Sequence, residues 1–213
     1  MWYRLASIAL AAGCGGSPVA TTAPTPTESA PSPSTITIAR GRAVTVDGRI
    51  GADEWADAAS LAIETAPGWS VEARFKHDGT ALLFAFTNLE QRGAFRYPEV
   101  VLDVANDGGP MMGADDFWFH ASFRDCWSTG KVNDYKSCVP EAPGWSANNY
   151  TSQDAAPPVI ELAIPLATLA LTSEPHELGI AFDVTDTMAT WSFWPARAQL
   201  AIPATWGHAR VVP

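Results

Sequence analysis

The stretch WSVEARFKHDGTALLFAFTN, residues 69–88, carries the pattern that decides the fold. Its first half alternates apolar with polar residues, and the apolar positions are Trp69, Val71, Ala73 and Phe75. Successive side chains of a β-strand point to opposite faces, so these residues share one face of a strand. A turn over residues 77–80 separates them from a second apolar run, ALLFAFTN. The stretch therefore predicts a β-hairpin that contributes to a hydrophobic core.

Short segments of the same kind recur through residues 36–213, and long helical stripes are absent from the sequence. Further strands are expected at residues 36–39, 43–46, 99–104, 116–124, 159–164, 178–183 and 209–212. Helix is expected only in two short pieces, over residues 52–58 and in a turn that Pro165 begins, over residues 165–169. The pattern predicts an all-β domain over residues 36–213, a two-sheet antiparallel β-sandwich of immunoglobulin-like or jelly-roll type.

The first 35 residues have the composition of an export signal followed by a spacer. Arg4 precedes an apolar stretch, and small residues lead to Cys14, so residues 1–13 are predicted to be a signal peptide. The run LAAGC, residues 10–14, has the form of a lipobox, in which Cys14 becomes the lipidated first residue; Ala11 stands where Leu is usual. An ordinary cleaved secretory peptide is the alternative. Residues 14–35, rich in Pro, Thr and Ser, are predicted to be a disordered tether that holds the domain to a bacterial membrane in the cell envelope.

The charge balance argues against polyanionic partners. The chain has 13 Lys and Arg residues against 23 Asp and Glu residues, which gives a formal net charge of −10. A surface of this sign repels nucleic acid, so we expect no nucleic-acid partner.

Two cysteines remain beyond Cys14. Cys126 and Cys138 enclose a polar loop, and in an exported protein such a pair predicts a disulfide worth about 3 kcal/mol. The alternative of a metal site is poor, because no second Cys or His lies at ligand spacing beside them.

Six sets of residues follow one another in an order that matches a known family. They are Asp47-Gly48 with Glu54-Trp55; Asp78 with Leu82-Leu83-Phe84; residues 99–103; residues 160–165 with Leu169; residues 179–182; and Trp191 or Trp194 with Pro203 and Gly207. Together they resemble carbohydrate-binding module family 9 and its wider relatives, which include DOMON-like domains, over residues 45–212. The resemblance implies a β-sandwich that binds sugars without catalysis and, in some members, binds calcium. Relatives on the same scaffold bind haem, so the fold alone does not settle the ligand.

Stacking residues for a sugar follow from the resemblance. In that family the ligand lies between two aromatic rings, one from a middle loop and one late in the chain. The late ring would be Trp191 or Trp194, and in the middle loop Phe95 or Tyr97 would serve, with Arg96 as a hydrogen-bond donor. Strand alternation puts the two late tryptophans on opposite faces, so we expect at most one to stack a ligand and the other to belong to the core.

The segment DFWFHASFR, residues 116–124, offers a second candidate surface. Its inward face would consist of Phe117, Phe119, Ala121 and Phe123. Trp118, His120 and Arg124 would then share the opposite face and could form the floor of a pocket. The alternative is a sheet face covered by the loop between the two cysteines.

An acidic, glycine-rich loop is the candidate metal site. Its ligands would be Asp103, Asn106, Asp107, Asp115 and Asp116, with Asp183 and Asp186 as weaker candidates. Hard oxygen ligands on a flexible loop suit calcium, and the family resemblance favours a structural ion. The alternative is an ordinary turn at Asn-Asp-Gly-Gly.

The sequence shows no catalytic constellation, so we expect a binding protein and not an enzyme. Asp115 and Asp116 are adjacent and would point to opposite faces of a strand, so they cannot flank one glycosidic bond. One alternative function is a haem-binding electron-transfer module with a non-covalent haem, since no C-x-x-C-H site is present; the conceivable axial ligands are Met111, Met112, His120 and Lys131. Another is a structural envelope lipoprotein without a small ligand.

Overall fold

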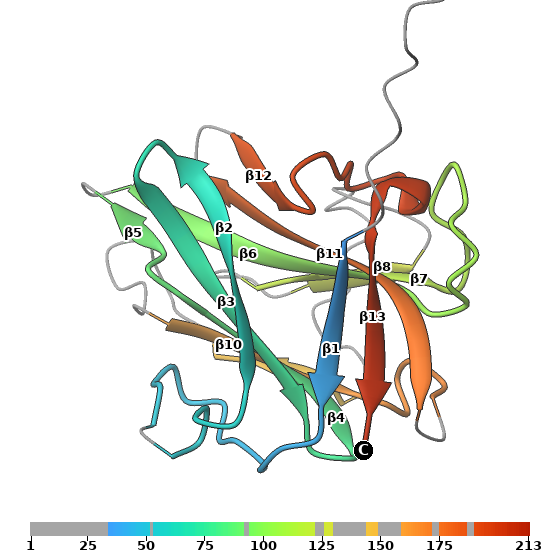
Figure 1. Ribbon diagram of the computed structural model, residues 1–213, viewed down its shortest axis with the longest axis horizontal. Coiled ribbons are helices and arrows are strands. Elements are labelled where there is room, and N and C mark those ends of the chain that lie inside the picture. The colour runs from blue at the N-terminus through green and yellow to red at the C-terminus, as the bar shows by residue number, and fades with distance from the viewer. Residues whose placement is uncertain are drawn as a thin grey trace, which may run out of the picture. The chain divides into compact units, whose positions relative to one another are not determined.

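Two β-sheets pack face to face in the computed structural model of this chain (Figure 1). The structure describes residues 34–213 except 52, 92–93, 122–125, 130–143, 149–158, 172–174 and 187–189. Residues 1–33, with the predicted signal peptide, Cys14 and most of the predicted tether, therefore lie outside the described residues. In the described part of the chain no helix is long and apolar enough to cross a membrane.

The larger sheet has eight strands and the smaller sheet has five. The larger sheet runs in the order β1 (Thr35–Ala39), β13 (Gly207–Val212), β11 (His176–Asp186), β6 (Ala94–Asp103), β7 (Asp116–His120) and β8 (Cys126–Thr129), with β12 (Trp191–Trp194) paired to β11 and β5 (Glu90–Gln91) paired to β6. The smaller sheet runs in the order β2 (Ala59–Ala66), β3 (Trp69–His77), β4 (Ala81–Thr87), β10 (Val159–Pro165) and β9 (Ser146–Ala147). Among the described strands, β1 and β13 pair in parallel and the other pairs are antiparallel. The predicted all-β, two-sheet sandwich is confirmed.

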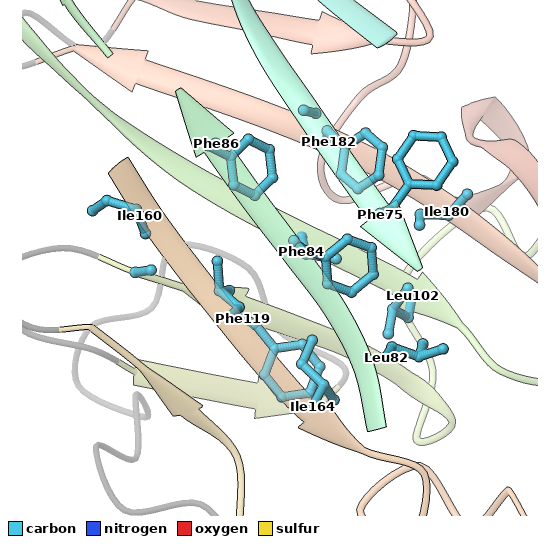
Figure 2. Packing of buried hydrophobic residues seen from close by; sticks show 14 of the residues in the cluster. Phe75, Leu82, Phe84, Phe86, Leu102, Phe119, Ile160, Ile164, Ile180 and Phe182 are labelled. Atoms are coloured by element: carbon cyan, nitrogen blue, oxygen red, sulfur yellow. The ribbon is translucent and has the colours of Figure 1, made fainter. Parts of the chain in front are cut away.

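The hairpin predicted from residues 69–88 is β3 followed by β4. The two strands pair antiparallel with Phe75 opposite Phe84. Both rings lie in the core between the sheets, where they meet Phe182 of the larger sheet (Figure 2). The ring centroid of Phe182 lies 6.0 Å from that of Phe75 and 5.7 Å from that of Phe84. Aromatic packing across the sandwich thus joins the hairpin to the opposite sheet.

Three sequence predictions of secondary structure were wrong. Residues 43–46 lie outside any strand, and residues 53–58 form turns where a helix was expected. The turn that begins at Pro165 is present, but over residues 166–170 it is not a helix. Among the described residues a short 3-10 helix lies instead at Pro203–Thr205. Strand β2 was missed altogether, because its alanine-rich sequence buries only Ile63 completely.

A buried carboxylate fixes the middle of residues 43–58, a segment that forms neither strand nor helix. Glu161 of β10 accepts hydrogen bonds from the backbone N–H groups of Asp47 and Gly48, at 3.0 and 2.8 Å, and from Trp55 Nε1 at 2.8 Å. The backbone N–H groups of Asp47 and Gly48 are therefore satisfied by a side chain and not by a neighbouring strand. Trp55 packs in this way on Leu83 and Ala85, on the outer face of the smaller sheet. The Asp-Gly and Trp of the family resemblance thus have a structural role here.

Candidate functional site

The outer face of the larger sheet carries its side chains in three neighbouring rows. In the β6–β11 pair, Glu99 lies opposite Asp183 and Val101 opposite Ala181, while Val100 and Phe182 point into the core. Strand β7 continues the rows with Trp118 beside Val101 and His120 beside Glu99. The three rows bring together four of the eight residues that the sequence suggested for a binding surface: Trp118, His120, Tyr97 and Trp191.

The first row, which consists of Trp118, Val101 and Ala181, is covered by another segment of the chain. Trp118 is fully buried and packs with Val101, Ala181 and three residues of the segment before β13: Ala198, Leu200 and Trp206. The interpretation of Trp118 as the floor of an open pocket is therefore wrong. The alternative of a covered sheet face is correct for this residue, although the cover that the structure describes comes from residues 198–206. Arg124, the third member of the proposed floor, lies outside the described residues.

The second row, which we call the polar row, consists of Asp183, Glu99 and His120. All three are buried, and His120 donates through Nδ1 to Glu99 Oε1 at 2.6 Å. Burial, followed by the negative charge of Glu99, raises the pKa of Asp183 to about 10, so Asp183 is protonated at neutral pH. Sequence reasoning missed Glu99 as a site residue. It treated Asp183 as a weak calcium ligand, although the structure places Asp183 beside Glu99.

The third row ends in the most exposed tryptophan of the described residues. Trp191 of β12 lies opposite Thr185 of β11, which in turn lies opposite Tyr97 of β6. The Trp191 side chain is 46% exposed. Trp194 points to the other face of the same strand, where its ring centroid lies 5.7 Å from that of Phe182. Trp194 is half-buried: it packs against the core and also lines the first of two hollows at Trp191, so the two tryptophans point to opposite faces but do not divide cleanly between surface and core.

The middle-loop residues are arranged differently from the expectation. Phe95 and Tyr97 are buried, with ring centroids 5.4 Å apart, and Tyr97 packs on His120. Arg96 points to the opposite face, and its guanidinium lies 4.9 Å from the ring centroid of Trp69. The structure therefore does not present Phe95, Arg96 and Tyr97 together as an open surface opposite Trp191.

Two hollows meet at Trp191 and Phe193, which line both of them. The first hollow has a volume of about 560 Å³ and is bounded on its other side by β2 and the turn after it, with Glu64 and Thr65 among its residues. The second hollow has a volume of about 340 Å³ and is bounded by residues 198–202. Both volumes lie in the range of small-molecule binding sites. An exposed aromatic ring between two hollows is an arrangement that can stack a planar or sugar-like ligand.

The acidic loop brings three of its five predicted ligands together. One carboxylate oxygen each from Asp103, Asp107 and Asp115 lie within 4.8 Å of one another. Asp103 also accepts the backbone N–H of Gly108 at 2.9 Å, which folds the loop around the carboxylates. Burial, with the charges of Asp103, Asp115 and Asp107, raises the pKa of Asp116 to about 6. This concentration of hard oxygen atoms fits a divalent cation such as calcium.

The remaining candidates are dispersed. Asn106 Oδ1 accepts a hydrogen bond from His208 Nδ1 at 2.8 Å and so is engaged away from the carboxylates. Met111 is 76% exposed, Met112 packs beside the covered first row, and His120 is engaged by Glu99. Cys138 and Lys131 lie outside the described residues, as do the side chains of Cys126 and Asp186, so the disulfide stays a prediction.

Comparison with known proteins gives results at the level of structure only. No protein-family model matches the sequence, and no curated protein matches it. Solved structures with a similar fold include a carbohydrate-binding module of family 9 from Caldicellulosiruptor kristjanssonii in complex with cellotriose (TM-score 0.55, 14% identity, 84% of this chain and 94% of that chain covered). The complex of such a module from the same organism with glucose gives a TM-score of 0.56 at 15% identity, covering 84% of this chain and 95% of that chain. A protein from Bacteroides uniformis ATCC 8492 that has been proposed to bind carbohydrate gives 0.53 at 11% identity, covering 84% of this chain and all of its own. The described part of this chain is therefore a β-sandwich with the fold of carbohydrate-binding module family 9.

Proposed function

We propose that this protein is an exported, non-catalytic carbohydrate-binding protein that stacks a sugar ring on Trp191. The observation that carries the proposal is the exposed Trp191 on the outer face of the larger sheet, between two hollows, in a fold whose solved relatives hold glucose and cellotriose. A sugar ring has C–H groups on its faces that pack on an indole ring, and its hydroxyl groups need polar partners. Glu64, Thr65 and Ser192 line the first hollow and can supply them.

The acidic pair of the outer face supports a binding role over a catalytic one. Asp183 and Glu99 are 0% and 1% exposed, and Asp183 holds its proton far above neutral pH. A glycosidase needs two carboxyl groups that reach opposite sides of the scissile bond, and neither carboxyl group of this buried pair is open to a substrate. The Asp183–Glu99 pair is instead suited to fixing the sheet behind Trp191.

A structural calcium ion at Asp103, Asp107 and Asp115 forms part of the proposal. The three carboxylates repel one another in the absence of a counter-ion, and a cation would remove that repulsion. The ion would hold residues 104–115, which connect β6 to β7.

Attachment to a bacterial membrane through a lipid on Cys14 is the remaining part. The lipobox-like run before Cys14 and the polar spacer after it support this assignment. In the Cys14→Ser variant the protein should move from the membrane fraction to the soluble fraction. Mass analysis of the mature N-terminus of the wild-type protein measures the lipid on Cys14. A mature chain that begins at any other residue, unmodified, would exclude the lipid anchor.

The direct test of sugar binding is a glycan array followed by titration calorimetry with each glycan that binds. Trp191→Ala should weaken binding to those glycans by about 1–3 kcal/mol, the range seen for stacking on an aromatic platform. Met111→Ala is the matched control, because it removes another large exposed side chain from the surface. An array on which the wild-type protein binds no glycan would refute the proposed function.

A further inference from the structure

The second hollow differs in chemistry from the first. Its lining is aromatic or aliphatic except for one amide side chain, that of Gln199. The residues are Trp191, Phe193, Ala198, Gln199, Leu200, Ala201 and Ile202. The first hollow, by contrast, includes a carboxylate and two hydroxyl groups from Glu64, Thr65 and Ser192. One side of Trp191 is therefore equipped for hydrogen bonds and the other side offers mainly hydrocarbon.

The wall of the second hollow is held together by hydrogen bonds that Gln199 makes through its backbone. The Gln199 N–H donates to Thr205 Oγ1 at 2.8 Å, and the Gln199 carbonyl accepts from Ile202 N at 2.9 Å and from Trp206 Nε1 at 2.9 Å. Leu200 is buried against Trp118 and Trp206, which anchors the segment to the sheet. These contacts form the wall in advance, and among the side chains of the lining Gln199 is the one non-aromatic group that could bind the hydroxyls of a second sugar.

We propose that the natural ligand is amphiphilic: a glycoside whose sugar stacks on Trp191 beside the first hollow and whose apolar aglycone lies in the second. This inference rests on the proposed sugar site and adds the class of ligand to it. Continuity supports it, because Trp191 and Phe193 line both hollows and one molecule can contact both. Charge supports it as well, since no charged residue lines the second hollow in a chain of net charge −10. An alkyl or aryl group loses no hydrogen bonds on entering such a space, whereas a sugar ring would.

The test compares glycosides that differ only in the aglycone. The probes are the methyl and n-octyl β-glycosides of glucose, galactose, mannose and N-acetylglucosamine, all used below their micellar concentrations. Full burial of one methylene group is worth about fourfold in affinity, so partial burial of an octyl chain should tighten binding at least about tenfold over the methyl glycoside. Titration calorimetry gives both affinities under the same conditions.

Two alanines of one turn provide the variant and its matched control. Ala201 and Ala204 are both exposed, but only Ala201 lines the second hollow. Ala201→Asp places a charge at the hollow and should reduce the gain from the octyl chain to below about threefold while leaving the methyl glycoside affinity unchanged. Ala204→Asp adds the same charge nearby and should keep the wild-type gain.

Other outcomes would overturn the inference. Equal affinities for methyl and octyl glycosides, or a gain that survives Ala201→Asp, would show that the aglycone does not enter the second hollow. Binding of octyl tetraethylene glycol ether as tight as that of the octyl glycosides would show that the sugar plays no part. If glycans bind on the array without any gain from the octyl chain, the inference fails and the proposed function stands. If no glycan and no glycoside binds, both fail.

Discussion

The outer faces of the two sheets each bury carboxyl groups, and the two faces treat them in opposite ways. On the smaller sheet, Glu161 accepts three hydrogen bonds, from two backbone N–H groups and one indole N–H. On the larger sheet, Asp183 and Glu99 face each other, and Asp183 keeps its proton because of burial and the neighbouring charge. A carboxylate whose hydrogen bonds are satisfied holds a loop in place. Two buried carboxyl groups that face each other beside an exposed tryptophan mark a face whose residues are not explained by stability alone. The smaller sheet thus uses its outer face to hold a loop, whereas the larger sheet exposes Trp191 on its outer face, where we propose that a sugar binds.

Removal of Glu161 should give the largest effect. Glu161→Ala leaves the Trp55 indole N–H and the N–H groups of Asp47 and Gly48 without their acceptor, and we expect the free energy of unfolding to fall by about 3–5 kcal/mol. Chemical denaturation measures it. Glu177→Ala, which removes an exposed carboxylate from β11, is the control and should stay within about 0.5 kcal/mol of wild type. If Glu161→Ala lost as little stability as the control, the claim that Glu161 holds the loop on the smaller sheet would be contradicted.

Calcium removal should have the next largest effect. Calcium at 100 times its Kd adds about 2.7 kcal/mol to the stability of the fold, so a chelator should lower the Tm by about 5–10 °C. Asp107→Ala removes one of the three clustered carboxylates and should abolish the difference between the two melting curves. Asp53→Ala, at an exposed site outside the cluster, should retain it. Identical melting curves with and without chelator in the wild-type protein would contradict the calcium site and support the alternative of an ordinary turn.

The Asp183–Glu99 pair should make stability depend on pH. The pKa of Asp183 is about 10 in the folded protein against its ordinary value of 3.8, so the folded state binds more protons across this window. Stability is then lost as pH rises from about 4 toward 10, and Asp183→Asn removes that loss. We expect the variant to gain at least about 1 kcal/mol over wild type between pH 5 and pH 9. Asp53→Asn is the control for loss of an exposed carboxylate. If the stability of Asp183→Asn changed with pH in parallel with that of the wild type, the raised pKa of Asp183 would be contradicted.

The sequence was informative where a local pattern determined the outcome. The alternation in residues 69–88 predicts β3 and β4, and the alternation in residues 191–194 places Trp191 and Trp194 on opposite faces. Local pattern fails where a distant residue decides. Residues 43–46 have no strand partner: the Thr45 N–H donates to Glu54 Oε1, and Glu161, more than 100 positions away, takes the N–H groups of Asp47 and Gly48 that follow.

The same limit applies to the candidate site. An outward Trp118 reads as a surface residue until Leu200 and Trp206 are known to cover it. Glu99 becomes a site residue only through the register that sets β6 beside β11, which no short stretch of sequence reveals. The aromatic anchor could thus be predicted, whereas the polar row behind it required the sheet topology.

Parallel measurement of melting and of glycan affinity for Trp191→Ala and Trp194→Ala tests the central claim most directly. Trp194 is half-buried and packs on the core through Phe182, with its ring tight against Gly207, so Trp194→Ala should lose about 3 kcal/mol of stability. Trp191→Ala should melt like wild type and lose about 1–3 kcal/mol of glycan affinity. A Trp191→Ala variant that melts normally and binds glycans as tightly as wild type would contradict the assignment of this face to the ligand.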